Sequence, residues 1–362
     1  VTESHPIIGL EIKKALRNGK TLIVADTRKV WLAKKAQTFL NLQPGTDASL
    51  VNAIISVIIK EKLHDEKYIE KRTDKFKTLN SAITKNDISK AVKLTGVSQD
   101  AIEEAARIYA NAENAIILYG NGITQHRSGN DNVKSLVNLA LLTGNVGKEC
   151  SGIYPLMGQN NGQGAFNMGA LPDFYTDSQP VSDINVRKKL EKIYKTKLSK
   201  NKGLQIREMF DAASKGKVKA MYVMGADPVM SEPDTTKVKK ALSKLDFLVV
   251  QDIFMSNTAQ YADVVLPAAC FAEKDGTFTN MERRVQRIRK TVKPPGEAKA
   301  DWNIISELST CMGSPMNYSS PEAIWEEIRK VSPNFAGINY QRLDNGGIQW
   351  PCPKTDHPGT KF

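Results

Sequence analysis

The chain has 362 residues, 41% hydrophobic and 25% charged, a composition typical of a folded globular protein. At this length we expect two domains, and no apolar run approaches the roughly 20 residues that a membrane-spanning helix needs. The net charge of +12 comes mostly from Lys dispersed along helical stretches, without a nucleic-acid-binding motif, so a polyanion-binding module is the weakest functional alternative. No export signal opens the chain, but its first residues read as the interior of a domain, so its start says nothing about targeting. A cytoplasmic location is the expectation.

The first half of the chain alternates between helical and strand patterns. Amphipathic periodicity predicts helices, and short apolar runs predict strands. The helix at 44–63 has Thr46 or Asp47 as its N-cap. The predicted elements in chain order are a helix at 5–19, a strand at 21–26, a helix at 28–37, a short strand at 39–43, a helix at 44–63, helical sequence at 66–112, a strand at 115–120 and a helix at 131–144.

The composition changes between residues 150 and 175, where Gly, Asn and Gln are dense and charge is scarce. Glycine lets backbone N–H groups approach a ligand closely, so this stretch is expected to wrap one. We place the domain boundary here, giving domains at 1–155 and 156–362. The second domain is predicted to contain a Lys-rich helical insertion, three strands and a terminal coil with no closing element, at 176–203, 219–224, 246–251, 263–267 and 348–362.

Four apolar runs end abruptly at Asp26, Gly122, Asp227 and Asp252. Uninterrupted apolar runs are typical of strands buried on both faces of a parallel sheet. Ligands of open α/β sheets bind just beyond the carboxyl ends of such strands. Because the four ends fall as two pairs in the two halves, we expect two nucleotide sites, or one cofactor with two nucleotide tails.

The polar residues at these ends suggest particular contacts. Asp26, with Thr27 and Arg28, suits ribose and phosphate, although capping of the following turn explains it equally well. Gly45 to Asp47 is an anion site at a helix start or a plain N-cap. The segment from Gly120 to His126 lacks the third Gly of a dinucleotide fingerprint, but its amides suit the edge of a pterin or purine.

The remaining candidates are the end of the fourth apolar run, two histidines and the cysteines. Gln251 and Asp252 end the strongest strand, and an Asp there can accept from two donors of a guanine. We interpret His5 and His126 as structural. The four cysteines are far apart, which argues against zinc or iron–sulfur ligation within this chain and predicts buried free thiols.

These ordered blocks resemble one family, the molybdenum and tungsten bis-pterin guanine dinucleotide oxidoreductases, and within it the large (alpha) subunit of formate dehydrogenase. The matching stretches run almost from end to end: TESHPIIG, IVADTRK, PGTDASLVNA, NLALLTGNVGK, GQNNGQGAFNMGALPDFY, YVMGADP, VVQDIFMSNTAQYADVVLPA and EKDGTFTNMERRVQR. The resemblance implies two Rossmann-like, doubly wound, three-layer α/β domains. Each would bind the guanine dinucleotide tail of one of two molybdopterin cofactors.

The resemblance also implies cofactor contacts at matching positions. One tail would be held by residues of the first domain, the pterins by amides near the domain boundary, and the other tail by residues of the second domain. These are Glu3, Asp26, Thr27, Arg28, Gly45 and Asp47 for the first tail, Asn121, Gln125 and Gln159 for the pterins, and Asp227, Gln251, Asp252, Lys274 and Asp301 for the second tail.

Family members begin with a 4Fe–4S segment, followed by the Cys or selenocysteine that ligates molybdenum or tungsten and, in formate enzymes, an adjacent His. They usually end with a C-terminal cap domain that also contacts the pterins, and the resemblance places both of these parts outside this chain. The resemblance therefore implies that this chain is a central portion, without catalytic or metal-ligating residues and unable to turn over alone. The implied reaction is oxidation of formate to CO2, with electrons passed to an iron–sulfur relay and electron-transfer subunits.

One departure leaves alternatives open. Met157 stands where formate dehydrogenases carry an Arg that orients the substrate carboxylate, and a thioether cannot make that charge-assisted bond. Met157 and Lys274 favour a nitrate-reductase-like enzyme. A non-catalytic scaffold, like the large subunit of NADH dehydrogenase, is a further alternative.

Overall fold

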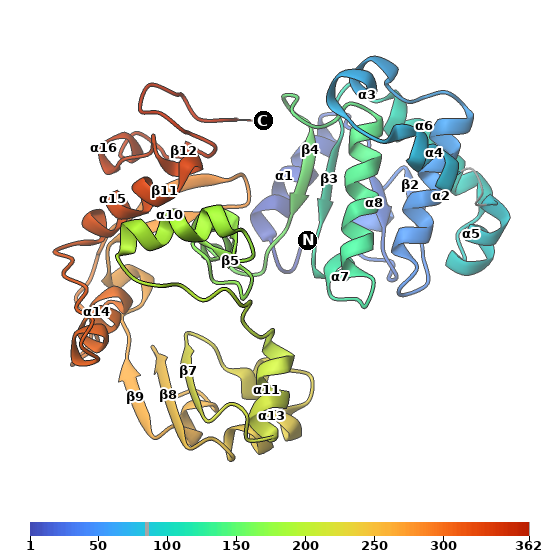
Figure 1. The fold of residues 1–362 in the computed structure, drawn as a ribbon. Helices are drawn as coiled ribbons and strands as arrows, with labels where there is room; N and C mark the ends of the chain where they lie inside the picture. Colours follow the sequence, from blue (N-terminus) through green and yellow to red (C-terminus); the bar gives the residue numbers. More distant parts are fainter. Residues whose placement is uncertain (84–86, 362) are drawn as a thin grey trace. The chain divides into compact units, whose positions relative to one another are not determined.

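In the computed structural model, which describes residues 1–83 and 87–361, the chain forms two compact units. Unit 1 comprises residues 1–159 with Lys361, and unit 2 comprises residues 160–360 (Figure 1). Both mix helices with short strands, and the expected α/β class is confirmed.

Unit 1 contains two separate pairs of parallel strands. β1 (Ile23–Ala25) pairs with β2 (Thr38–Leu40), and β3 (Ile116–Tyr119) pairs with β4 (Gly152–Pro155). The helical elements around them are α1 (Pro6–Arg17), η1 (Leu32–Lys35), α2 (Asp47–Lys60), α3 (Glu66–Arg72), α4 (Phe76–Ile83), α5 (Ile88–Thr95), α6 (Gln99–Asn111), α7 (Asn121–Thr124) and α8 (Gly129–Leu142).

The core of unit 1 is organised around α2, which is apolar on nearly every side. All of its residues from Ala53 to Ile59 are buried, and Ile55 and Ile58 are completely so. A helix that is hydrophobic all round needs partners on every face. It obtains them from α6 and α8, whose buried side chains complete the same cluster, and from α5, whose partly buried side chains pack against it.

Unit 2 contains a three-stranded parallel sheet in the order β7–β8–β9, with strands Ala220–Met224, Phe247–Asp252 and Val264–Pro267. Helices α11 (Ile206–Ser214) and α13 (Thr235–Leu242) pack on one face (Figure 1), where their apolar side chains form a core with Leu248 and Val250. On the other face Tyr222, Met224 and Phe247 are exposed.

The remainder of unit 2 is an antiparallel sheet with its own helices. Its core contains Trp325, Phe335 and Trp350, and Trp325 Nε1 donates to the Ile338 carbonyl at 2.6 Å. The antiparallel sheet is β10 (Gly276–Thr279), β11 (Arg284–Ile288) and β12 (Ile348–Gln349), and β5 (Phe174–Tyr175) and β6 (Gln179–Pro180) form a separate antiparallel pair. The helical elements of unit 2 besides α11 and α13 are α9 (Gly162–Asn167), η2 (Thr176–Ser178), α10 (Ile184–Tyr194), η4 (Phe271–Glu273), α14 (Asp301–Cys311), α15 (Pro321–Val331), η5 (Pro333–Phe335) and α16 (Tyr340–Leu343), with α12 (Pro228–Ser231) and η3 (Ala259–Tyr261), which pack with the parallel sheet.

Most predicted elements are confirmed, and three expectations are wrong. The helix predicted at 28–37 is only the single turn η1, because the backbone is already extended at Ala36 and the Gln37 N–H donates to the Leu22 carbonyl beside β1. The strands are parallel but not buried on both faces, since helices cover only one face of β7–β9. The terminal coil is packed: β12 joins the sheet, and Cys352 is fully buried.

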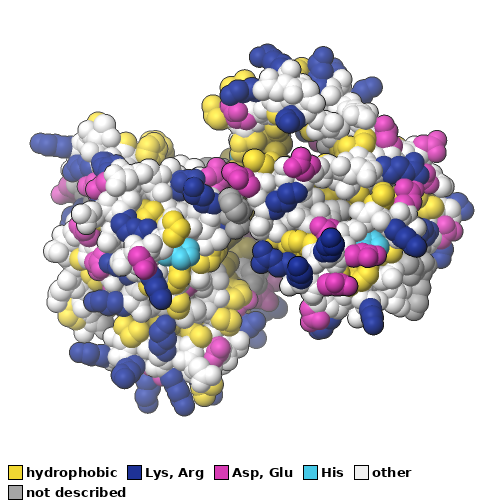
Figure 2. Space-filling view, turned by 90° about the horizontal axis from the view of Figure 1, so that it is seen from above, with side chains coloured by type: hydrophobic (Ala, Val, Ile, Leu, Met, Phe, Trp, Pro, Cys, Tyr) yellow, Lys and Arg dark blue, Asp and Glu magenta, His cyan; other side chains and the backbone are white. Residues whose placement is uncertain are grey.

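The cysteine prediction holds in part. Cys352 is buried and Cys270 half-buried, but Cys150 and Cys311 are exposed, and all four are free thiols. On the face shown in Figure 2, Lys and Arg are scattered among acidic side chains over both units. Among the described residues, the helices are too short or too polar to span a bilayer.

The role of α2 predicts the effect of a core substitution. Replacing Ile58 by Ala removes a fully buried side chain from the centre of unit 1 and should cost about 2–5 kcal/mol in free energy of unfolding. Ile7→Ala, at a site 70% exposed, is the control and should change stability by less than about 0.5 kcal/mol. Urea denaturation followed by circular dichroism measures both, and equal effects would contradict the assigned core.

Candidate functional site

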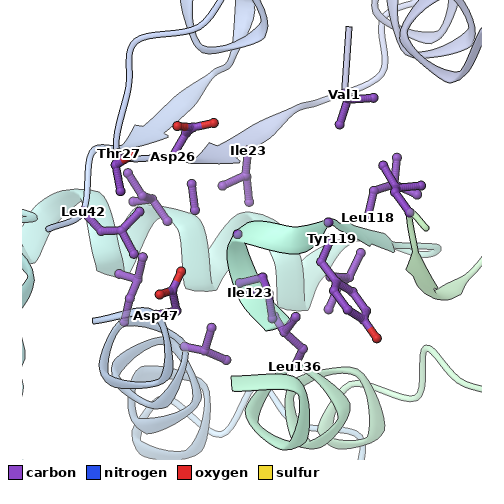
Figure 3. Close-up of a pocket in the computed structure, with 18 of the residues that line it drawn as sticks. Val1, Ile23, Asp26, Thr27, Leu42, Asp47, Leu118, Tyr119, Ile123 and Leu136 are labelled. Atoms are coloured by element: carbon purple, nitrogen blue, oxygen red, sulfur yellow. The ribbon is translucent and has the colours of Figure 1, made fainter. Parts of the chain in front are cut away.

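A cavity of about 720 Å³ lies in unit 1, bordered by β1 and β3 (Figure 3). Its walls are mostly aliphatic. The polar residues gather where the two strands end, and they include four predicted cofactor contacts besides the backbone of Gly45. These are Asp26, Thr27, Asp47 and Asn121. The structure therefore brings five of the nine residues predicted for the first tail and the pterins to one cavity.

Asp26 is held by the turn that follows β1. One carboxylate oxygen accepts from the Arg28 backbone N–H at 2.8 Å, and the Asp26 carbonyl accepts from the Asn41 side chain at 3.0 Å. The turn-capping interpretation of this Asp is thus confirmed. It does not preclude ligand binding, because a carboxylate has further acceptor positions.

The start of α2 provides the second polar feature of the cavity. Gly45 has φ +81°, a left-handed conformation that favours glycine, and nothing would contact a Cβ there within 4 Å. Thr46 is the N-cap, but its hydroxyl donates to the Gln43 carbonyl and does not cap the helix. The first-turn N–H groups of this 14-residue helix are thus not capped by that side chain, and they favour an anion.

Three predicted residues of unit 1, Glu3, Arg28 and Gln125, are exposed and do not line this cavity. Gln159 is also exposed, at the end of the unit. His5 is structural, as expected: its Nε2 donates to the Met157 carbonyl at 2.8 Å, and Nδ1 accepts from the Ser4 hydroxyl at 2.9 Å. This bond fixes the backbone directly before the GQNN loop.

In unit 2, a chain of hydrogen bonds connects three predicted residues at the carboxyl end of β8. Gln251, fully buried, donates from Nε2 to Asp301 Oδ1 at 2.6 Å and accepts from the Tyr222 hydroxyl. Lys274 forms an ion pair with the other oxygen of Asp301. We call Tyr222, Gln251, Lys274 and Asp301 the β8 network.

Backbone pairing positions the β8 network. Ala269 N–H donates to the Lys299 carbonyl at 2.8 Å, and Lys299 N–H donates to the Pro267 carbonyl at 3.1 Å. These bonds tie the segment before α14 to the end of β9, so that Asp301 reaches Gln251. Burial, with a smaller effect from the nearby Asp301 charge, raises the pKa of Tyr222 and keeps its hydroxyl protonated as a donor.

Asp227, which follows β7, anchors the turn after β8. Its carboxylate accepts from the N–H groups of Asn257 and Thr258, both at 3.0 Å, from the Asn257 side chain at 3.3 Å and from the Thr258 hydroxyl at 2.6 Å. Burial alone would raise the pKa of Asp227, but these hydrogen bonds together outweigh it and lower that pKa.

Apolar side chains surround the polar groups at this end of the sheet. Asp252 accepts from the Ile253 N–H at 2.7 Å, and the loop that follows leaves Phe254 77% and Met255 67% exposed. Met230 of α12 and Phe271 of η4 are 70% and 63% exposed. Large apolar side chains gathered around polar ones are typical of a binding surface.

Within residues 1–83 and 87–361, no three His, Cys, Asp or Glu side chains are arranged to hold a metal ion. Sequence patterns missed two contributors, Tyr222 and Thr258. Tyr222 reaches Gln251 only because β7 and β8 are neighbours, and Thr258 reaches Asp227 across 31 positions. No short-range spacing signals either contact.

Parallel strands that end in polar residues, with helices packed on them, define an open α/β class of fold, whose ligands bind at the carboxyl ends of the strands. Residues 1–311 match the molybdopterin oxidoreductase family. The chain belongs to that family, as the resemblance predicted.

Relatives agree with this assignment. The chain is 51% identical over 362 residues to the F420-dependent formate dehydrogenase subunit alpha of Methanocaldococcus jannaschii, covering 99% of this chain and 53% of that protein. It is 42% identical over 355 residues to formate dehydrogenase H of Escherichia coli, covering 98% and 50%. The chain thus spans about half the length of these relatives.

A solved structure shares the fold. Acetylene hydratase from Pelobacter acetylenicus superposes with a TM-score of 0.72 at 23% identity, covering 93% of this chain and 48% of that one. The molybdopterin-type α/β fold is therefore confirmed.

Family membership implies a molybdopterin cofactor with molybdenum or tungsten. The residues present fit the organic part of such a group: α2 offers N–H groups toward an anion, and Lys274 offers a cation beside buried amide and carboxylate groups. When bound, the cofactor supplies the redox chemistry, and the chain supplies binding and orientation.

The anchoring of Asp227 predicts a pH-dependent stability. Asp227→Asn removes the charge that accepts four hydrogen bonds and should lower the free energy of unfolding at pH 7 by about 1–3 kcal/mol. Because the folded-state pKa is lowered, the carboxylate contributes fully above its unfolded value of about 3.9, and the contribution is lost as pH falls through the folded value.

Denaturation followed by tryptophan fluorescence measures this, since Trp302, Trp325 and Trp350 lie in unit 2. The difference between wild type and Asp227→Asn should be constant above about pH 5 and shrink below about pH 4. Asp246→Asn is the control, because its pair with Lys219 is exposed and contributes less than about 1 kcal/mol. A difference that grows in acid would contradict the assignment.

Proposed function

We propose that this chain is the central, cofactor-binding part of a formate dehydrogenase-like enzyme. The observation that carries the proposal is the β8 network, a buried Gln and a Lys–Asp pair at the carboxyl end of a parallel strand, in a chain of this family. The relatives named as formate dehydrogenases support the reaction. Formate would lose two electrons and a proton to give CO2, and the electrons would pass to an iron–sulfur relay and partner subunits.

The finer form of the cofactor is part of the proposal. Two molybdopterin guanine dinucleotides would bind, one tail per unit, with the first near Asp26 and Asp47 and the second near the β8 network. The 4Fe–4S cluster and the metal-ligating Cys or selenocysteine would be supplied by polypeptide outside these residues, so the chain alone would not turn over. The cytoplasmic location stays a prediction.

The proposed roles of unit 2 residues differ according to their partners. The four hydrogen bonds that Asp227 accepts hold the turn at 257–258, so its role would be to shape the site. Lys274 and Asp301 are 22% and 31% exposed at their side chains, which leaves them accessible to a polar ligand while they position each other. Asp252, the last residue of β8, would be the guanine acceptor at the end of this strand.

The β8 network predicts loss of cofactor when Asp301 is neutralised. In the full-length protein, Asp301→Asn leaves the Lys274 charge without its ion pair, and pterin retention should weaken about tenfold or more. Pterin per polypeptide, measured after oxidation to its fluorescent form, and molybdenum and tungsten by mass spectrometry report this. Asp246→Asn, which removes an exposed pair with Lys219, is the control. Full pterin in Asp301→Asn with unchanged thermal stability would refute the assignment.

A substitution at Met157 tests whether the substrate is formate or, as in the alternative function, nitrate. An Arg at this position would form a charge-assisted bond to a carboxylate, so Met157→Arg in the full-length enzyme should lower KM for formate about tenfold. Met157→Leu, which keeps an apolar side chain, is the control and should leave KM unchanged. The His5 bond to the Met157 carbonyl is a backbone contact and is available to both variants.

Viologen-coupled assays separate the candidate functions. Formate oxidation supports the proposal, whereas nitrate reduction without formate oxidation identifies the nitrate-reductase-like alternative that Met157 and Lys274 favour. A full-length protein with neither metal nor pterin would indicate the non-catalytic scaffold.

A further inference from the structure

The cavity of unit 1 separates two pairs of strands that end at the same site. β1 pairs only with β2, and β3 only with β4, among the described strands. β1 and β3 both border the cavity, and Figure 3 shows Ile23 and Asp26 on one side of the open space and Leu118 and Tyr119 on the other. In a continuous parallel sheet these strands would be joined by hydrogen bonds.

The backbone directions of β1 indicate an unused edge. Asp26 N–H donates to the Leu40 carbonyl at 3.2 Å, and the Leu22 carbonyl accepts from Gln37 at 2.9 Å. In a parallel strand, alternate residues direct both backbone groups to one neighbour. Leu22, Val24 and Asp26 thus serve β2, while Ile23 and Ala25 direct their N–H and C=O groups to the opposite edge. Both of these residues line the cavity.

The same reasoning applies to β3. The carbonyls of Ala115 and Tyr119 accept from Gly152 and Leu156, at 3.2 and 2.6 Å. The odd-numbered residues therefore serve β4, and Ile116 and Leu118 direct their backbone groups away from it. Both line the cavity as well. Two unpaired edges thus border one space.

The body of this cavity is apolar. Leu50, Val51 and Ile54 of α2 and Leu136 and Leu139 of α8 line it, and the polar residues lie at the strand ends. Unpaired strand edges need backbone partners, and a buried apolar wall needs apolar side chains. An extended apolar peptide satisfies both requirements, whereas a small polar molecule satisfies neither.

We propose that one additional parallel β-strand, from polypeptide that precedes α1 in the full-length protein, inserts between β1 and β3. A strand before α1 would form a β–α–β unit with β1, which places the two strands side by side and parallel. Val1, which precedes α1, lines the cavity. Polypeptide that precedes Val1 can therefore lie in the cavity and join α1 through a short connection. The relatives are about twice as long as the matched region, so they contain further polypeptide.

The inserted strand would join β2, β1, β3 and β4 into one five-stranded parallel sheet. Its side chains on one face would pack on α2 and α8, and its carboxyl end would lie with Asp26 and Asn121. In this last respect the inference rests on the proposed function, because the strand would complete the wall of the first cofactor site.

Hydrogen–deuterium exchange at single-residue resolution tests the strand. In residues 1–362 alone, the amides of Ile23, Ala25 and Leu118 should exchange rapidly, and in the full-length protein about 100-fold more slowly. The amides of Val24 and Tyr119, directed to β2 and β4, should be slow in both and serve as internal controls. Equal exchange rates of the edge amides in the two proteins would overturn the proposal. This includes the case in which self-association protects these amides in the short chain.

Engineered disulfides provide an independent test in the full-length protein. With a strand between them, β1 and β3 are about 10 Å apart, beyond the roughly 7 Å Cα separation that a disulfide spans. Ala25→Cys with Leu118→Cys should therefore stay reduced under mild oxidation. Leu118→Cys with Tyr154→Cys, at register partners of β3 and β4, should oxidise and is the matched control. Oxidation of the first pair would show direct pairing of β1 with β3 and overturn the proposal.

Neither measurement depends on cofactor. Failure of pterin binding would refute the proposed function and leave the strand intact. Equal exchange of the edge amides in a full-length protein that retains pterin would refute the strand and leave the proposed function intact.

Discussion

Parallel pairing of short strands is the constraint on which the rest of this molecule depends. Because β7, β8 and β9 run in one direction, residues separated by up to 50 positions meet where these strands end, and Gln251 there contacts Asp301. These contacts are specific because Gln251 is fully buried, and a buried amide needs a partner for both its oxygen and its nitrogen. The Tyr222 hydroxyl donates to the oxygen, and Asp301 accepts from the nitrogen. Neutralising one member would leave a buried polar group or the Lys274 charge without its partner.

Two surfaces of this chain are more apolar than is usual for protein surfaces in contact with water. One is the open face of β7–β9, with the exposed loops around Phe254, and the other is the cavity between β1 and β3. Both lie next to polar residues at strand ends, which suits a large cofactor with polar tails and a site completed by further polypeptide. The relatives, about twice as long as the matched region, are consistent with that arrangement.

In the proposed enzyme, the chain and the cofactor have different roles. The chain would hold and orient the cofactor, and the cofactor would supply the electron chemistry. Under this proposal, substrate choice would depend on the segment before the GQNN loop, where His5 donates a hydrogen bond to the Met157 carbonyl. The side chain at position 157 would decide whether an anionic substrate meets a positive charge or a thioether.

Hydrophobic periodicity determined the element types, because buried helices such as α2 and strands such as β8 carry their burial pattern in the sequence itself. The ordered motifs determined the family, and polar residues after apolar runs located the strand-end sites. Only the tertiary structure decided which of these residues meet. Gln251, Lys274 and Asp301 do, through the pairing of Lys299 with the end of β9, while Glu3 and Gln125 lie outside the unit 1 cavity. The helix expected at 28–37 gave way to strand pairing for the same reason: non-local hydrogen bonds and packing outweigh local propensity, and a single sequence does not reveal them.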